Sequence, residues 1–558
     1  MGAMLKFNED KQKQKVRQLR EREEEELVRI LADKYGVEYA DLTSVAIDTD
    51  ALRILPETDS RAAQVALFAA SQKKVSLAAR LPESKETKSV IVSLEERGFI
   101  PTIFIVSTRS LAFAWDRYKD IVAASGTSHG LLDIGNDEIE MLVSRIRTID
   151  DAVRSIEEVL KLKKTSRVSR VVEVFLAAAL AVGASDVHIE PEEKSVRLRF
   201  RLDGILMDVV SFDNETFRLL LSRIKLLSGL KLNIHEEPQD GRFSIRMRDK
   251  DIEIRTSTLP DENGESVVMR LLDPSSIRVS IEDLGIHPQL LKVIERELQK
   301  PNGMILTTGP TGSGKTTTLY AFLRRVHKPE IKIITIEDPI EYHLPGIVQT
   351  QTDEGKDYTF ASGLRAALRQ DPDIMMVGEI RDRETAEIAM NAALTGHLVF
   401  STLHTNNAAG AFPRLIDLGV NSNLMGSAIN LVLAQRLVRR LAPEYSKKVP
   451  IPENKKQLVA DMLARLPDTI QKPQTEYMWD VDTELAGHET GYRGRVGVYE
   501  GILVDDAVDN AVRTGGSDRD IIAAAAPQKI LSMRDDGILK VLSGITTFDE
   551  LARVVNVS

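Results

Sequence analysis

The chain of 558 residues contains no cysteine, so disulfide bonds and thiolate metal sites are both excluded. It also lacks a run of eighteen or more apolar residues, a secretory signal and a lipidation motif. These absences predict a cytosolic protein, and any membrane contact is expected to be through a partner or a surface.

The chain carries no excess of basic charge. Its 74 lysines and arginines stand against 84 acidic residues, which leaves a formal charge of −10. This balance argues against a protein that coats nucleic acid, although a local basic groove is compatible with it. The length predicts several domains, because a single core rarely grows beyond roughly 250–300 residues.

Residues 304–320, MILTTGPTGSGKTTTLY, are predicted to bind a nucleoside triphosphate. A short apolar run reads as a buried strand, a glycine-rich loop follows, and a helix begins near Lys315. The pattern matches G-x-x-x-x-G-K-[ST], in which backbone N–H groups and a helix N-terminus hold phosphates. Lys315 is expected to reach the β- and γ-phosphates, and Thr316 to ligate Mg²⁺. The predicted nucleotide-binding residues are Gly309, Pro310, Thr311, Gly312, Ser313, Gly314, Lys315, Thr316 and Thr317.

Composition and periodicity divide the chain into five segments. We expect a charged helical arm at 1–26, a small α/β domain at 27–125, a linker at 126–165, a second small α/β domain at 166–279, and the nucleotide-binding domain at 280–558. The predicted fold class is therefore multidomain α/β.

Strands and helices alternate after the phosphate loop, which predicts a parallel sheet. The expected strands are 332–336, 373–377 and 398–402, and the expected helices are 360–369, 384–394 and 423–440. Ligands of such sheets sit off the carboxyl ends of the strands. The acids that follow these strands are therefore expected to converge on the phosphate loop.

Phosphoryl transfer needs positioned charge more than covalent chemistry. Thr316 and Glu379 are expected to hold Mg²⁺ directly or through water, and Glu341 to orient and deprotonate the attacking water, with Glu337 and Asp338 as alternatives. No His, Asp and Glu set has the spacing of a structural metal site, so the Mg²⁺ carried by ATP is the only metal expected.

Two histidines, His397 and His404, flank the strand at 398–402. Either they are core or capping residues, or together they sense the γ-phosphate. In the second small domain, Arg197, Arg199 and Arg201 share one face of a strand. That face is either a solvated surface or a source of charge neutralisation for a bound triphosphate.

These motifs together resemble the secretion ATPase superfamily that powers type II secretion and type IV pili. GPTGSGKTTTLY is similar to its Walker A motif, ITIEDPIEY to its aspartate box, MMVGEIRDRETAEIA to its Walker B motif, and TGHLVFSTLHTNNA to its histidine box. SDVHIEP, RLRFRLDG and QDGRF resemble its second N-terminal domain. The segment up to residue 118 resembles the first N-terminal domain of the GspE- and PilB-like assembly branch.

The resemblance implies a RecA-like ATPase domain preceded by a PAS-like domain that supplies arginines. It implies nucleotide and Mg²⁺ contacts at Lys315, Thr316 and Glu379, and catalysis at Glu341. Phosphate-facing arginines are implied at Arg255 and Arg270, and also at Arg242. Its members form hexamers that move an inner-membrane platform protein (PilC/GspF-like) and so drive pilin or pseudopilin assembly. A cytoplasmic accessory protein at the N-terminal domain is a further implied partner.

Two features depart from the family pattern. Many members carry a four-cysteine zinc subdomain after the LVRRL segment, whereas residues 442–489 contain no cysteine, so zinc is excluded there and ordinary packing must hold the insert. No convincing cyclic-di-GMP motif is present. Two other functions remain open: a nucleic-acid translocase, which acidic charge and the lack of aromatic-interleaved basic runs disfavour, and a nucleotide-gated scaffold that scarcely hydrolyses ATP.

Overall fold

The computed structural model divides into two compact units, Met1–Leu272 and Asp273–Ser558. It describes residues 24–557 apart from 26, 33, 44, 46, 72–73, 119–130, 133–135, 162–163, 248–249, 274–278, 468–469, 474–475 and 487–488. Residues 1–23 and 26 of the predicted charged arm lie outside the described residues, as do 126–130, 133–135 and 162–163 of the predicted linker.

The first unit begins with a small sheet in the order β1-β4-β3-β2. Its strands are β1 (Glu38–Tyr39), β2 (Val65–Ser71), β3 (Lys74–Ala79) and β4 (Ile100–Ile105), and its helices are α2 (Thr49–Arg53), α3 (Glu57–Ala62), α4 (Lys85–Glu96) and α5 (Thr108–Asp116). The two longer helices begin at serine N-caps, because the side chains of Ser84 and Ser107 accept backbone N–H groups of the first turn.

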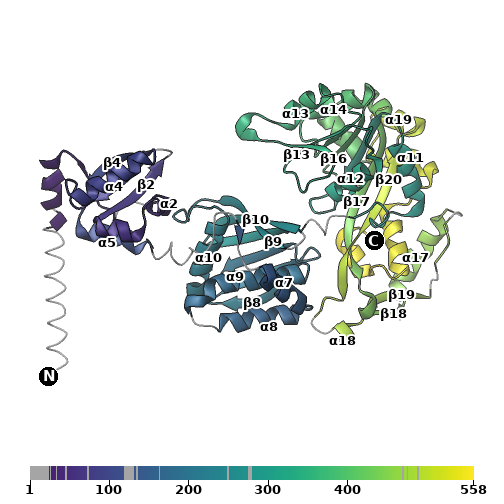
Figure 1. The fold of residues 1–558 in the computed structure, drawn as a ribbon. Helices are drawn as coiled ribbons and strands as arrows, with labels where there is room; N and C mark the ends of the chain where they lie inside the picture. The colour runs from purple at the N-terminus through teal and green to yellow at the C-terminus, as the bar shows by residue number, and fades with distance from the viewer. Residues whose placement is uncertain are drawn as a thin grey trace. The chain divides into compact units, whose positions relative to one another are not determined.

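A second sheet of the same unit, of which Figure 1 labels β8, β9 and β10, has the order β5-β9-β10-β11-β6-β7-β8. Its strands are β5 (Leu131–Leu132), β6 (Asp186–Pro191), β7 (Val196–Leu202), β8 (Ile205–Phe212), β9 (Gln239–Met247), β10 (Lys250–Asp261) and β11 (Gly264–Leu272). The helices are α7 (Asn136–Arg145), α8 (Ile149–Leu160), α9 (Lys164–Ala181) and α10 (Asn214–Leu227). They share one apolar core with alternate strand residues, which leaves charged residues on the other face.

The predicted linker at 126–165 is wrong for its helical part. Ile139 of α7, Ile146 just after it, and Ala152 and Ile156 of α8 are buried in the core of the second sheet. The charged residues of these helices suggested a bridge, but each helix also carries an apolar stripe at helical spacing, and that stripe decides where it packs.

The second unit is built on a sheet in the order β14-β13-β15-β16-β12-β17-β20, parallel except for β20. Its strands are β12 (Gly303–Thr308), β13 (Ile333–Glu337), β14 (Val348–Gln351), β15 (Ile374–Val377), β16 (Leu398–Leu403), β17 (Ile429–Leu441) and β20 (Tyr492–Leu503). The helices are α11 (Pro288–Leu298), α12 (Lys315–Val326), α13 (Phe360–Leu368), α14 (Arg383–Leu394), α15 (Ala411–Asp417), α16 (Ser422–Ala428), α19 (Asp506–Arg513) and α20 (Asp518–Ala525). The predicted α/β class with a parallel-sheet nucleotide-binding domain is confirmed.

Helices cover both faces of this parallel sheet (Figure 1). Residues of α11 and α12 pack with Ile305 and Phe400 on one face, whereas α13, α14 and α16 pack with Met304, Leu306 and Val399 on the other. Because both faces are buried, the strands are continuous apolar runs. The expected helix at 423–440 is wrong: α16 ends at Ala428, and β17 follows between β12 and β20.

The cysteine-free insert at 442–489 is folded by apolar packing. It contains the two-stranded sheet of β18 (Ser446–Pro450) and β19 (Tyr477–Val481) with α17 (Glu453–Arg465) and α18 (Thr483–Ala486), and α21 (Met533–Leu542) and α22 (Phe548–Val554) complete the C-terminal end. Ile451, Val459, Met462 and Met478 of the insert belong to the same core cluster as the main sheet.

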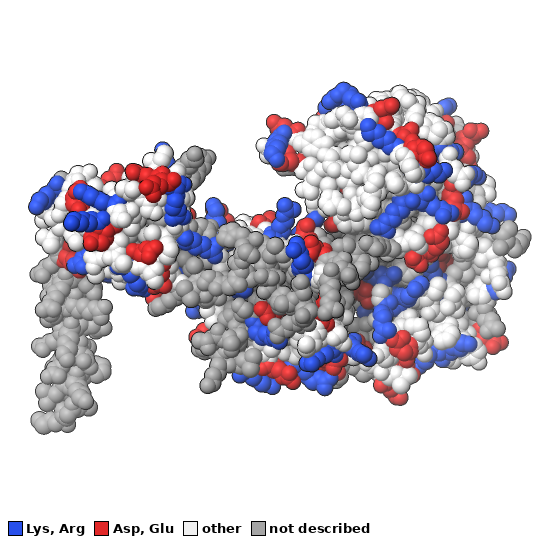
Figure 2. All heavy atoms as spheres, viewed as in Figure 1, with Lys and Arg blue, Asp and Glu red and all other residues white. Residues whose placement is uncertain are grey.

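The surface mixes the two signs of charge. Lysines and arginines lie among acidic residues over the face that Figure 2 shows, as is usual for a solvated surface. Among the described residues, no helix combines the length and apolarity needed to cross a bilayer.

Candidate active site

The phosphate loop, residues 309–314, joins the end of β12 to the start of α12. Gly309, Gly312 and Gly314 have φ of 152°, 77° and 89°, a region that glycine adopts readily. A Cβ on Gly309 would lie 2.5 Å from the Ser313 hydroxyl and 2.7 Å from the Gln435 carbonyl oxygen. The loop therefore needs glycine both for its backbone turn and for its close approach to β17.

Lys315 lies over this loop. Its ammonium group donates to the carbonyl oxygens of Gly309, at 2.8 Å, and Pro310, at 3.2 Å. Burial lowers the pKa of the Lys315 ammonium; the nearby Glu379 carboxylate opposes that shift, and the Arg436 guanidinium adds to it. A half-buried cation beside a helix N-terminus and a ring of loop amides fits the polyanionic tail of a nucleoside triphosphate.

Two further groups gather at the carboxyl ends of neighbouring strands. Glu379 follows β15 and His404 follows β16, which itself pairs with β12. His404 Nε2 lies 3.2 Å from a Glu379 carboxylate oxygen. Arg381 pairs with Glu379 and lies 3.5 Å from the Asp338 carboxylate. The structure thus brings Glu379, His404 and Asp338 into one charged group, joined by an arginine for which the sequence suggested no role.

His397 lies at the opposite end of β16. Its ring Nδ1 is 3.1 Å from the Ala392 carbonyl oxygen, and its own carbonyl accepts from the N–H of Gly303, where β12 begins. A strand of six residues places about 20 Å between its two ends. The prediction that His397 and His404 act together on a phosphate is therefore wrong for a site within one chain, and His397 is a capping residue.

Glu337 is buried, with 2% of its surface exposed. Its carboxylate accepts hydrogen bonds from the hydroxyls of Thr335 and Tyr320 and from the Gln349 amide. Burial raises the pKa of the Glu337 carboxyl, although these hydrogen bonds oppose the shift. Of the predicted alternatives for the base, Glu337 is thus enclosed in the core, whereas Asp338 is exposed and Glu341 half-buried in the loop that follows.

We expect Glu337→Gln to remove a pH-dependent loss of stability. Because the folded-state pKa is raised, the stabilisation by this group is complete below its unfolded pKa, about 4.3, and is lost as pH rises through the folded pKa. The wild type should therefore lose unfolding free energy relative to the variant as pH rises over that window. Urea unfolding at a series of pH values measures this; a difference that does not change with pH would contradict the raised pKa.

β17 supplies two site residues that sequence reasoning missed. Thr308 of β12 pairs with Ala434, so Gln435 and Arg436 lie level with the start of the phosphate loop. The Gln435 side-chain amide donates to the Ser313 carbonyl oxygen at 2.7 Å. Arg436 donates to the Asn406 carbonyl oxygen at 2.8 Å, which ties it to the segment after His404. Both residues were missed because a helix, and not a strand, was predicted for this segment.

The remaining predicted arginines belong to the first unit. Arg255 pairs in register with Arg242 on one neighbouring strand and with Arg270 on the other, so the three lie side by side on one face. Arg255 Nε lies 3.1 Å from a Glu253 oxygen, and Arg270 Nε lies 3.0 Å from an Asp186 oxygen. Whether they meet a nucleotide stays a prediction.

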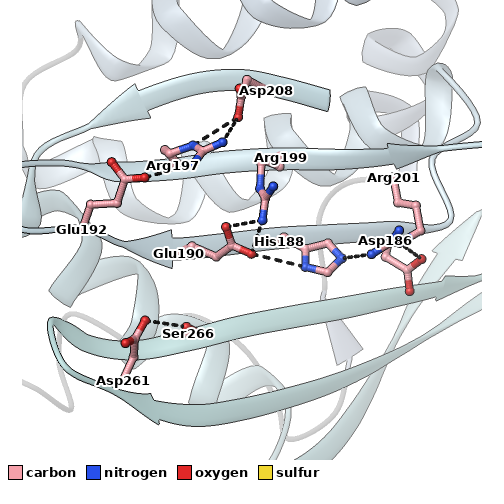
Figure 3. Close-up of polar contacts among 10 residues, drawn as sticks. All are labelled: Asp186, His188, Glu190, Glu192, Arg197, Arg199, Arg201, Asp208, Asp261 and Ser266. Carbon is pink, nitrogen blue, oxygen red and sulfur yellow. Dashed lines mark hydrogen bonds and ion pairs between the residues drawn. The ribbon is translucent and has the colours of Figure 1, made fainter. Parts of the chain in front are cut away.

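Arg197, Arg199 and Arg201 extend this charged face onto β7 (Figure 3). Arg197 pairs with Glu192 and Asp208, Arg199 with Glu190, and Arg201 with Asp186. Each of these charges already has an acidic partner within the domain, as expected of a solvated ladder of ion pairs.

Thr316 and Glu379 stay the predicted ligands of Mg²⁺. Thr316 is exposed at the first turn of α12, and Glu379 lies close enough to Lys315 to affect its pKa. A hydroxyl and a carboxylate are oxygen donors of the kind Mg²⁺ takes when it arrives with a nucleotide. Among the described residues, no group of three or more His, Asp and Glu side chains forms a metal cluster.

The sequence is similar to proteins of secretion systems. Residues 161–553 match the family model of type II/IV secretion system proteins. The chain is 44% identical over 411 residues to type II secretion system protein E of Pseudomonas aeruginosa, covering 73% of this chain and 80% of that protein. It is 44% identical over 405 residues to type II secretion system ATPase E of Vibrio cholerae, covering 72% and 78%. The solved structure of the Legionella pneumophila ATPase DotB is similar with a TM-score of 0.49 and 22% identity, covering 69% and 94%.

Proposed function

The chain belongs to the type II/IV secretion system protein family, and we propose on that basis that it hydrolyses ATP to move a membrane platform protein during secretion. The observation that carries the proposal is the arrangement at the carboxyl ends of β12, β15 and β16. There Lys315 lies over the phosphate loop, while Glu379 contacts His404 and affects the Lys315 pKa.

The chemistry follows from these side chains. The loop amides and Lys315 bind the phosphates and hold the γ-phosphoryl group for in-line attack. Glu341 accepts the proton of the attacking water as general base, and His404 stands beside Glu379 as a sensor of the phosphate. Mg²⁺ held by Thr316 and Glu379 would neutralise charge on the phosphates. Gln435 of β17 stabilises the conformation of the phosphate loop through its hydrogen bond to the Ser313 carbonyl oxygen.

We assign the chain to secretion or pilus assembly by its relatives. The two sequence relatives reported above are named for type II secretion, which favours assembly of a pseudopilus over extension of a type IV pilus. The active unit is a homo-hexamer, and Arg255 and Arg270 stay predicted as phosphate-facing residues. Its partners are an inner-membrane platform protein and a cytoplasmic accessory protein at the N-terminal domain.

The proposal is tested by the hydrolysis assay of the purified full-length chain. We expect ATP to be converted to ADP and phosphate only with Mg²⁺, at a rate that single- or double-stranded DNA does not change, by a species of six times the mass of the chain. Stimulation by DNA would support the translocase instead. Tight ATP binding with no turnover, even by the hexamer with its platform protein, would support the scaffold.

A further inference from the structure

The loop that carries Glu341 runs from the end of β13 to the start of β14, residues 338–347. It begins next to the buried Glu337 and contains Glu341 midway. A general base works only if its carboxylate is held within hydrogen-bond reach of the water it deprotonates. What fixes this loop therefore bears on catalysis, and the structure gives it several specific attachments.

The first attachment comes from the helix of the phosphate loop. Tyr320 of α12 is fully buried, and its hydroxyl donates to the Glu337 carboxylate. A hydrogen bond from the backbone of Glu341 reaches the same hydroxyl. One hydroxyl thus joins the last residue of β13 to the backbone of the predicted base.

The second attachment comes from β14. The Gln349 side-chain amide donates to the Tyr342 carbonyl oxygen at 3.1 Å and to Glu337 at 3.0 Å, while its carbonyl oxygen accepts the N–H of Leu344 at 2.6 Å. Gln349 therefore holds the backbone of the loop on the far side of Glu341. Tyr320 and Gln349 together form hydrogen bonds with residues before and after the predicted base.

Ring contacts reinforce this arrangement. The Tyr320 and Tyr342 rings meet edge to face, with centroids 4.5 Å apart and planes at 75°. Arg324, one turn further along α12, lies over the Tyr342 ring and donates to its hydroxyl at 3.4 Å. A T-shaped pair of this kind is favourable and directional. The loop is thus packed on the same helix that begins at Lys315.

We propose that Tyr320 and Gln349 are positioning residues that set the Glu341 carboxylate relative to the phosphates. Tyr320 lies five residues after Lys315, about 7.5 Å along one rigid helix, so the group that holds the phosphates and the group that holds the base loop share a single element. The inference rests on the proposed role of Glu341 and adds the means by which that residue is placed.

The test compares Tyr320→Phe, which removes only the hydroxyl, with Tyr492→Phe as a matched control. Tyr492 is partly buried, and its hydroxyl is likewise hydrogen-bonded, 2.8 Å from that of Thr547 at the C-terminal end of the chain. We expect kcat to fall about tenfold in Tyr320→Phe, the usual effect of one lost hydrogen bond. The Kd for a fluorescent ATP analogue should change less than about twofold, and the control should match the wild type in both.

Combining Tyr320→Phe with Glu341→Gln distinguishes a positioning role of Tyr320 from a merely structural one. In Glu341→Gln, where the base is absent, Tyr320→Phe should cause no further loss of single-turnover rate, because a misplaced group that cannot act has no further effect. Gln349→Leu, a more exposed site that is less prone to misfolding, should show the same kcat loss, the same intact nucleotide binding and the same non-additivity.

The outcomes distinguish this inference from the function it rests on. If Glu341→Gln hydrolyses ATP like the wild type, the base assignment fails whatever the tyrosine variant does. If Glu341→Gln is inactive and Tyr320→Phe behaves like Tyr492→Phe, only the positioning role fails. An equal loss of kcat from Tyr320→Phe with and without Glu341, or a parallel loss of nucleotide binding, would also overturn the positioning role.

Discussion

Lys315→Ala is expected to weaken ATP binding by about 100-fold or more and to abolish hydrolysis. The Lys315 ammonium already lies over the loop, where it donates to the Gly309 and Pro310 carbonyl oxygens. When a nucleotide binds, the ammonium exchanges these neutral acceptors for charged phosphate oxygens. Hydrogen bonds between charged groups are about twice as strong as neutral ones, and several are lost together. Burial lowers the pKa of this amine, which reflects a partly desolvated site where added negative charge is favoured.

Titration with a fluorescent ATP analogue measures the effect of Lys315→Ala, and Lys328→Ala is its control. Lys328 is exposed just beyond the end of α12 and changes the charge of the domain by the same amount. The control should bind like the wild type. Binding by Lys315→Ala within twofold of the wild type would show that the phosphates lie elsewhere.

Glu341→Gln is expected to keep ATP binding and to lose turnover by about 10²–10⁴-fold, the usual contribution of a general base. The amide keeps the shape of the side chain but cannot accept a proton. The measurement is single-turnover hydrolysis together with the Kd for nucleotide, and Glu330→Gln, an exposed position before β13, is the control.

If Glu341→Gln hydrolyses ATP normally, the base assignment is wrong and Asp338 becomes the next candidate. Asp338 is exposed and faces Arg381, whereas Glu337 is enclosed by Thr335, Tyr320 and Gln349. The rate of hydrolysis by Asp338→Asn then shows whether Asp338 or Glu341 is the base.

The phosphate loop could be predicted because its chemistry is local. The glycines, Lys315 and Thr316 are adjacent in sequence, and the strand before them and the helix after them have strong signatures. Glu379 and His404 could also be related to this loop, since parallel topology sends successive strand ends to the same edge of the sheet. The strands at 332–336, 373–377 and 398–402 were correspondingly well predicted.

β17 could not be recognised from composition. INLVLAQRLVRRL is rich in leucine and arginine, both good helix formers, and its strand conformation comes from burial between β12 and β20. Tertiary context overrides propensity here, and Gln435 and Arg436 were missed with it. The apolar run at 431–434, without polar residues at helical spacing, was the available signal.

Sequence also does not show at which end of a strand a residue lies, or which of two neighbouring acidic side chains is buried. His397 and His404 flank β16 symmetrically, but one lies at its amino end and the other at its carboxyl end. Glu337 and Asp338 are neighbours, yet one side chain enters the core and the other faces solvent. Burial of a single carboxylate depends on residues such as Tyr320 and Gln349 that come from other elements, so sequence order alone does not reveal it.

The insert at 442–489 shares its apolar core with the catalytic sheet instead of closing on a metal. Val459 and Met462 belong to the same cluster as Met304 and Leu306. These two residues lie in β12, the strand that directly precedes the phosphate loop. Because it contains no cysteine, this insert offers no thiol to an oxidant. Because the cluster is shared, we expect the insert and the nucleotide-binding sheet to unfold together, and a substitution that weakens the packing of α17 to destabilise β12 as well.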